Sequence, residues 1–145
     1  WISHEILTGA AVYAFSGDIL YAMFSMAGSV LPDKMEGNPQ AQRSYWSWRS
    51  RHRGWSHWPM LYGLLLGLQL QLLQNPAFAA MADMLIIGVY LCLGALLHIA
   101  EDAVCGKVPL LLPSQKVGIR LFTVGSVMEY LFAIVVVLVC YILSR

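Results

Sequence analysis

The chain has 145 residues, which is the length of a single domain, and 59% of them are hydrophobic while only 12% are charged. An ordinary soluble domain carries about 25% charged residues, so this composition excludes that class and indicates a membrane protein. The net charge is only +1, so the chain has no excess of basic residues and we expect no nucleic-acid partner. Three widely separated cysteines form no CxxC pair, which predicts packing roles rather than disulfides or a thiolate zinc site.

The first apolar stretch, residues 6–31, is interrupted by Ser16-Gly17-Asp18. Glycine favours a turn, and an aspartate at this position is a good cap for the start of a second helix. We therefore predict a helical hairpin, with helices at residues 5–15 and 19–31, rather than one continuous span. A hairpin would return His4 and Asp33 to the same side, whereas a single span would separate them by about 30 Å.

Three further apolar stretches predict membrane helices at residues 59–74, 77–103 and 121–143. Gly63 and Gly67 form a small-xxx-small step that would let another helix approach closely, although chance also produces this spacing. The sequence therefore predicts an all-α fold. We expect a single domain over residues 1–145, a polytopic membrane helical bundle with an N-terminal helical hairpin followed by about three membrane helices.

Basic residues indicate the orientation of this bundle. Eight of the nine lie in two loops, residues 32–58 and 104–120, that share one face in the predicted topology: Lys34, Arg43, Arg49, Arg51, Arg53, Lys107, Lys116 and Arg120. By the positive-inside rule this face is cytoplasmic, and Trp46, Trp48, Trp55 and Trp58 fit the aromatic belt at headgroup level. The proline-flanked leucine run at residues 106–115 predicts a loop that dips into the interface and helps to wall a site.

All four histidines reach the same face in this topology. His98 and Asp102 are four residues apart in a predicted helix, so they share one side of it. Alone, such a pair is more typical of a structural hydrogen bond, but His4, Asp33 and His57 are expected beside it. Ionisable groups near a membrane helix end are costly unless paired, and imidazole with carboxylate suits zinc or manganese. The sequence therefore predicts that these five residues hold a divalent metal, most simply zinc.

The stretch "RHRGWSHW", residues 51–58, supplies catalytic candidates beside the ligand His57. His52 is a second ligand or a general acid/base, and Arg53 with Arg51 could hold an anionic group of a substrate. An interfacial anchor is the favoured explanation for the arginines and tryptophans, but not for the histidines. Three carboxylates complete the predicted site as outer partners that orient ligands: Glu36, Glu101 and Glu129, the last of which is equally well explained as a buried structural group.

His4, "LPD" at 31–33, "HRGWSH" at 52–57 and "LLHIAEDAVCGKVPLLLP" at 96–113 together carry a family resemblance. The chain resembles a family of bacterial inner-membrane, metal-dependent hydrolases that includes a LexA-regulated member. The resemblance covers roughly residues 4–130. Two departures stand out: Asp33-Lys34-Met35-Glu36 replaces the family's Asp-x-Asp-His, and residues 103–105 lack the family's threonine turn.

These patterns predict a membrane-embedded, metal-dependent hydrolase at the cytoplasmic surface of the bacterial inner membrane. Its location favours a lipid, or a lipid-linked ester or phosphoester, as substrate. Because family residues are missing, a non-catalytic metal-binding scaffold or a partner-binding subunit is the alternative, as a homo-oligomer or with another protein. A carrier lined by Asp18, Asp83 or Glu129 is disfavoured, since the sequence shows no internal repeat and two of these residues fall near helix ends.

Overall fold

The computed structural model describes residues 2–37, 52–123 and 125–145. Helices α1 (Ile2–Ser16) and α2 (Ile19–Glu36) form the predicted hairpin. Gly17 adopts a positive φ of 66° in the turn, and the Asp18 carboxylate accepts hydrogen bonds from the backbone N–H groups of Leu20 (2.7 Å) and Tyr21 (3.3 Å). Both the hairpin and the capping role of Asp18 are therefore confirmed.

Helix α2 continues past the predicted end at residue 31. It runs through the fully buried Pro32 and ends at Glu36, where Gly37 takes a positive φ of 82°. The missing N–H of a proline normally weakens a helix interior, but here the ring is enclosed by the fold. As a result Asp33 and Glu36 project from helical positions rather than from a loop.

The second pair of helices matches its predicted positions closely. Helix α4 (Pro59–Leu73) begins with a proline in its first turn, and α5 (Ala82–Cys105) follows a short 3-10 helix, η3 (Pro76–Met81). The prediction placed 77–103 in one α-helix, whereas its first residues are the 3-10 segment. A second 3-10 turn, η2 (Trp55–His57), directly precedes α4.

The last helix is shorter than predicted. Helix α6 (Val127–Leu143) starts after Ser126, whose side chain accepts the Glu129 N–H, and the described residues 121–123, 125 and 126 are not helical. Between α5 and α6 the predicted loop contains two short strands, β1 (Val108–Pro109) and β2 (Lys116–Val117). They pair antiparallel, with Val108 opposite Val117.

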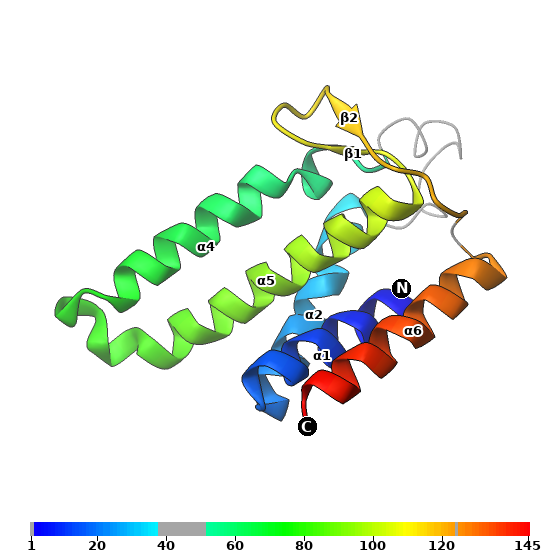
Figure 1. Ribbon diagram of the computed structural model, residues 1–145. Helices are drawn as coiled ribbons and strands as arrows, with labels where there is room; N and C mark the ends of the chain where they lie inside the picture. The colour runs from blue at the N-terminus through cyan, green and yellow to red at the C-terminus, as the bar shows by residue number, and fades with distance from the viewer. Residues whose placement is uncertain (1, 38–51, 124) are drawn as a thin grey trace.

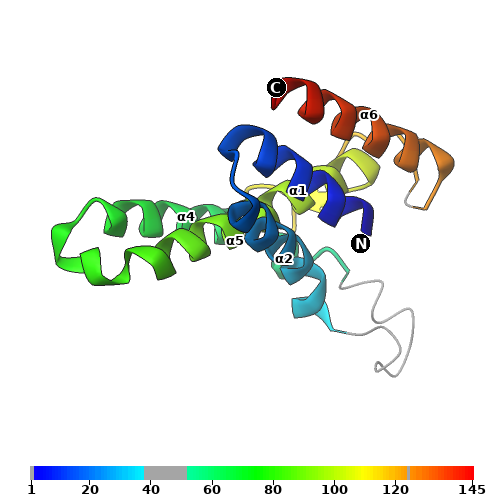
Figure 2. The ribbon, with the colours of Figure 1, turned by 90° about the horizontal axis from the view of Figure 1, so that it is seen from below.

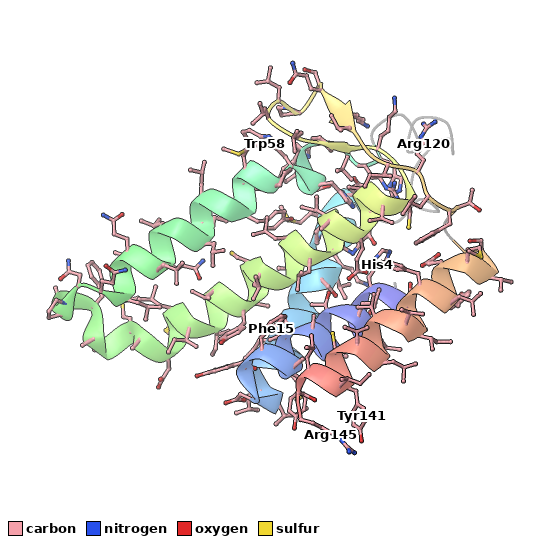
Figure 3. All side chains as sticks on the ribbon, viewed as in Figure 1. His4, Phe15, Trp58, Arg120, Tyr141 and Arg145 are labelled. Carbon is pink, nitrogen blue, oxygen red and sulfur yellow. The ribbon has the colours of Figure 1, made fainter. Side chains whose placement is uncertain are left out.

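Figures 1 and 2 show that α1 and α2 lie against the C-terminal half of α5 and that α6 lies along the outer side of α1, while α4 and the rest of α5 project as a helical pair. The start of α1, α4 and α6 and the end of α2 and α5 lie at one end of the molecule. Trp58 and Arg120 lie at this end, whereas Tyr141 and Arg145 lie at the opposite end (Figure 3). This arrangement agrees with the predicted convergence of the histidine-bearing segments.

Helices α2 and α5 cross in close contact because glycines lie at their crossing. A Cβ atom on Gly94 would overlap the backbone carbonyl of Ser25, and one on Gly28 would overlap that of Leu91. The rings of Tyr21 and Tyr90 stack across the same interface with centroids 4.2 Å apart. Small residues allow this approach in membrane helices, and the crossing places the end of α2 beside the end of α5.

Gly63 and Gly67 contact no other helix in the described part of the chain, which agrees with the alternative of chance spacing. Both glycines are exposed on α4, and no atom counted there lies within 4 Å of a Cβ built on either. These glycines lie on the exposed face of α4, because α4 packs against α5 through other positions. Tyr62, its one fully buried side chain, joins Ala95, Ile99 and Val108 in a small apolar core.

Within the described residues, one helical segment is long and apolar enough to cross a membrane, Pro76–Cys105. Helices α4 and α6 are apolar but shorter, with 15 and 17 residues. Large apolar side chains are exposed along both, among them Leu64, Leu68, Ile134, Leu138 and Ile142. An all-α fold is therefore confirmed, and a single helix satisfies the length criterion for a span.

Gly94→Val should destabilise the fold by at least about 2 kcal/mol, because the new side chain would force α2 away from α5. A thermal unfolding curve of the detergent-purified protein measures this effect. Gly67→Val is the matched control, since open space surrounds that position, and it should shift the midpoint much less. Equal shifts in the two variants would contradict a close crossing at Gly94.

Candidate metal centre

Four elements bring histidines and carboxylates together at one end of the fold. Helix α1 contributes His4, the end of α2 contributes Asp33 and Glu36, the segment before α4 contributes His52, Arg53 and His57, and the end of α5 contributes His98, Glu101 and Asp102. The ring centroids of His98 lie 4.7 Å from those of His4 and 5.4 Å from those of His57. The structure therefore gathers the predicted histidines in one cluster.

The centre of the cluster has the spacing of a metal site. Nε2 of His57 lies 3.4 Å from Asp33 Oδ1 and 3.3 Å from Asp102 Oδ2. Nε2 of His98 lies 3.7 Å from Asp33 Oδ2 and 3.8 Å from Asp102 Oδ2. A tetrahedral ion with bonds of about 2.0–2.1 Å keeps its ligand atoms about 3.3–3.4 Å apart. Asp33, His57 and His98 each bring one ligand atom to within 4.8 Å of the others, and Asp102 Oδ2 lies near both Nε2 atoms, so the centre approaches the separation that such an ion requires.

Three buried ring nitrogens of this centre make no hydrogen bond among the described residues: Nε2 of His57 and both Nδ1 and Nε2 of His98. His57 is 0% exposed and His98 is 2% exposed. An unsatisfied buried polar group is costly, and most native examples are satisfied by a water, an ion or a ligand. The two Nε2 atoms face two carboxylates, and this donor set fits a divalent cation.

Glu36 fixes the orientation of the His57 ring. Its Oε1 atom lies 2.9 Å from His57 Nδ1 and accepts hydrogen bonds from the hydroxyl of Ser56 (3.0 Å) and the backbone N–H groups of Arg53 (2.6 Å) and Gly54 (3.3 Å). With Nδ1 held by a carboxylate, Nε2 points at the centre of the cluster. Metal-binding histidines commonly have such an outer partner.

The same carboxylate also binds His52. Glu36 Oε2 lies 2.7 Å from His52 Nδ1, and the His52 side chain is 29% exposed. Asp33, Glu36 and His52 form a second group whose ligand atoms lie within 4.8 Å of one another. His52 is therefore nearer to solvent than His57, at the edge of the cluster.

Arg53, which was expected to hold an anionic group of a substrate, binds a carboxylate of the cluster instead. Its guanidinium contacts Asp102 Oδ1 at 2.8 Å and the Asp102 carbonyl oxygen at 3.3 Å, and its side chain is 14% exposed. The backbone of Arg53 has a positive φ of 56°, and the bond from its N–H to Glu36 holds this uncommon conformation. Arg53 thus fixes Asp102 and links the 52–57 segment to α5.

His4 lies at the side of the central group. Its Nδ1 bonds Glu101 Oε2 at 2.5 Å, and its Nε2 is 3.9 Å from Asp102 Oδ1. Figure 3 shows His4 between the start of α1 and the end of α5. Glu101 therefore contacts a predicted ligand, as expected for an outer partner.

Among the described residues, the hydrogen bonds of Glu129 connect two helices and do not involve a histidine ring. One oxygen accepts from the Ser3 hydroxyl (2.6 Å) and the other from the Gly125 N–H (2.5 Å). This pair of bonds joins the start of α6 to the start of α1, one residue before His4. The contact favours the structural explanation of this carboxylate.

Burial and the surrounding carboxylates act in opposite directions on the pKa of His57. Burial lowers its pKa, but the carboxylates of Asp102, Asp33 and Glu36 outweigh this effect and raise the pKa of His57 to about 10. Without a cation the ring therefore holds a proton at neutral pH. A metal ion that used Nε2 would have to displace that proton.

Several contacts of the site were not predicted from the sequence. Ser56 and Ser3 each precede a cluster histidine by one residue and bond a carboxylate, and Lys116 donates to the carbonyl of His52 at 3.1 Å. The repeated Ser-His dipeptide was the available signal. Of the predicted features, Trp46, Trp48, Arg43, Arg49 and Arg51 lie outside the described residues.

Comparison with known proteins supports the membrane assignment. The family model of the YdjM inner membrane protein matches residues 1–145, so the expectation of a bacterial inner-membrane family is confirmed. No curated protein and no solved structure matches the chain. The chain belongs to the YdjM inner membrane protein family.

Proposed function

We propose that this chain is a membrane-embedded, metal-dependent hydrolase with its site at the cytoplasmic membrane surface. The observation that carries the proposal is the pair of buried Nε2 atoms of His57 and His98, which make no hydrogen bond among the described residues and face Asp33 and Asp102 at 3.3–3.8 Å. These four residues would hold the ion, with His4 beside them. Zinc suits this donor set best, and manganese is the second choice.

A divalent ion in this position would supply Lewis-acid chemistry, polarising a scissile ester or phosphoester bond and lowering the pKa of a water. The remaining residues have separate tasks. Glu36 and Glu101 hold the Nδ1 atoms of His57 and His4, Arg53 holds Asp102, and His52 handles a proton. A partly exposed histidine that is oriented by a carboxylate is suited to general acid/base catalysis.

The location of the site at the membrane surface favours a lipid substrate. The cluster lies at one end of the helices, where basic loops meet the headgroup layer and the positive-inside rule predicts the cytoplasm. Several helices would cross the bilayer, because α4 and α6 expose apolar side chains along their length. A lipid, or a lipid-linked ester or phosphoester, would reach such a site from the bilayer.

A metal-binding scaffold is the second candidate, and the burial of the central ligands favours it. His57 and His98 are almost completely enclosed, which is typical of a structural ion that ties elements together. Both candidates require the ion, whereas only the hydrolase requires a proton-handling His52. Metal content and activity therefore have to be measured separately.

The detergent-purified protein should contain stoichiometric zinc or manganese by elemental analysis, and His98→Ala and Asp102→Ala should each lose it. His98→Ala removes a ligand nitrogen, whereas Asp102→Ala removes a ligand oxygen together with the contact to Arg53, so His98→Ala is the cleaner test. Asp83→Asn, at the other end of α5, is the matched control and should retain the metal. Absence of metal in the wild-type protein, even after reconstitution, would end the proposal for both candidates.

His52→Asn should lower kcat on a lipid-like ester or phosphoester by about 100-fold and leave the metal content unchanged. The asparagine retains a polar side chain near Glu36 but cannot take up a proton. Turnover of fluorogenic substrates by wild type and variant provides the measurement. A metal-loaded wild-type protein that is inactive on all of them would favour the scaffold.

Apparent metal affinity should rise with pH by up to about tenfold per unit between pH 6 and 9, because the metal competes with one proton on His57. Affinity rises with pH because the pKa of His57 is raised to about 10. Below that pH the ring holds a proton, which must leave before Nε2 can bind the metal. Titration against a buffered free-metal series measures this slope. A flat profile would show that His57 is not a ligand.

A further inference from the structure

The β1–β2 hairpin presents an apolar tip at the same end of the molecule as the cluster. Leu110, Leu111 and Leu112 are 48%, 64% and 53% exposed, although three consecutive leucines would be expected in a core. The base of the hairpin is different, because Val108 and Pro109 are buried against α5 and η2. A firmly packed base therefore carries an exposed apolar tip.

Hydrogen bonds keep this tip in a defined shape. The N–H of Leu110 donates to the Gln115 carbonyl (3.1 Å), and the N–H of Gln115 donates to that of Leu112 (3.0 Å). The indole N–H of Trp58 donates to the Leu111 carbonyl at 3.1 Å. A segment that leaves water must have its backbone N–H and C=O groups hydrogen-bonded, and these bonds satisfy several of those in the tip.

Basic and aromatic side chains surround the leucines. Lys107, Lys116 and Arg120 are exposed on or beside the hairpin, and Trp55 is 57% exposed next to it. Figure 3 shows Trp58 and Arg120 at this end of the molecule. Leucines flanked by tryptophan and by lysine or arginine are typical of a surface that enters the interfacial layer of a bilayer.

We propose that Leu110, Leu111 and Leu112 insert into the interfacial layer of the bilayer, while Lys107, Lys116 and Arg120 bind the headgroups of anionic lipids. The charge decides between this occupant and a second copy of the chain, because an isologous contact would bring these basic side chains together. A bilayer is also the surface that membership of an inner-membrane family implies for this chain.

Insertion of the hairpin would also position the cluster, whether or not a metal is bound there. Lys116 bonds the carbonyl of His52, and Trp58 lies one residue after His57 while it holds Leu111. A hairpin seated in the interface would therefore hold the 52–58 segment at headgroup depth. The inferred insertion rests on family membership and exposed residues, and it remains testable if the protein proves to contain no metal.

The test is a depth measurement by spin labelling of the full chain in vesicles. Cysteine is introduced as Leu111→Cys in a variant whose three native cysteines are replaced by alanine, and Thr123→Cys, exposed outside the hairpin, is the comparison position. Collision rates with oxygen, which concentrates in the acyl region, and with a water-soluble nickel complex report the environment. Circular dichroism and gel filtration first establish that each labelled protein is folded.

The label at Leu111 should collide more with oxygen and less with nickel than the label at Thr123. Equal nickel accessibility at both positions would overturn the insertion. Vesicles with anionic lipid should deepen the Leu111 label relative to neutral vesicles, and Lys107→Gln, Lys116→Gln and Arg120→Gln together should abolish that difference. An identical depth in both kinds of vesicle would overturn the headgroup contact. A nickel-protected label that reports close spin–spin distances would instead identify a second copy as the occupant.

Discussion

The buried carboxylate of Asp102 is the group on which the site end of this fold depends. It contacts Arg53 at 2.8 Å and lies 3.3–3.9 Å from ring nitrogens of His57, His98 and His4. An isolated buried charge is very costly, so the carboxylate requires these neighbours in place. They come from α1, from the segment before α4 and from α5 itself, and satisfying one charge therefore holds three parts of the chain together.

The glycine crossing of α2 and α5 explains how Asp33 reaches the same centre. Gly28 and Gly94 let the two backbones touch near the middle of the bundle, and the C-terminal parts of both helices then run toward the cluster. Pro32 keeps its place in the buried face of α2, and helical geometry continues to Glu36. A wider crossing would separate Asp33 from His98, and the central group would lose its shared carboxylate.

The sequence predicted the helices and the residues of the cluster better than the contacts among them. The hairpin at Gly17-Asp18 follows from local turn and capping chemistry, which a sequence shows directly. The pair His98 and Asp102 follows from helical periodicity. By contrast, the link from Arg53 to Asp102 and the role of Glu36 depend on how distant segments pack, and no spacing encodes them. The choice of Gly28 and Gly94, rather than Gly63 and Gly67, for the close contact was hidden for the same reason.

Helix dipoles give a physical reason to expect a cation at this cluster. The C-terminal end of a helix favours positive charge, yet α2 ends with Asp33 and Glu36 and α5 ends with Glu101 and Asp102. In the described part of the chain, the ion pairs of the cluster connect these four carboxylates with one arginine and four histidines, and among these partners only the arginine is permanently charged. Lys34 is the one basic residue in the last turn of α2. Local preferences that conflict with the fold in this way mark functional sites. Protonated histidines can balance the excess, but a divalent ion would balance it while also satisfying the Nε2 atoms of His57 and His98. The four carboxylates at the helix ends and the unbonded histidine nitrogens therefore have one common explanation in a bound cation.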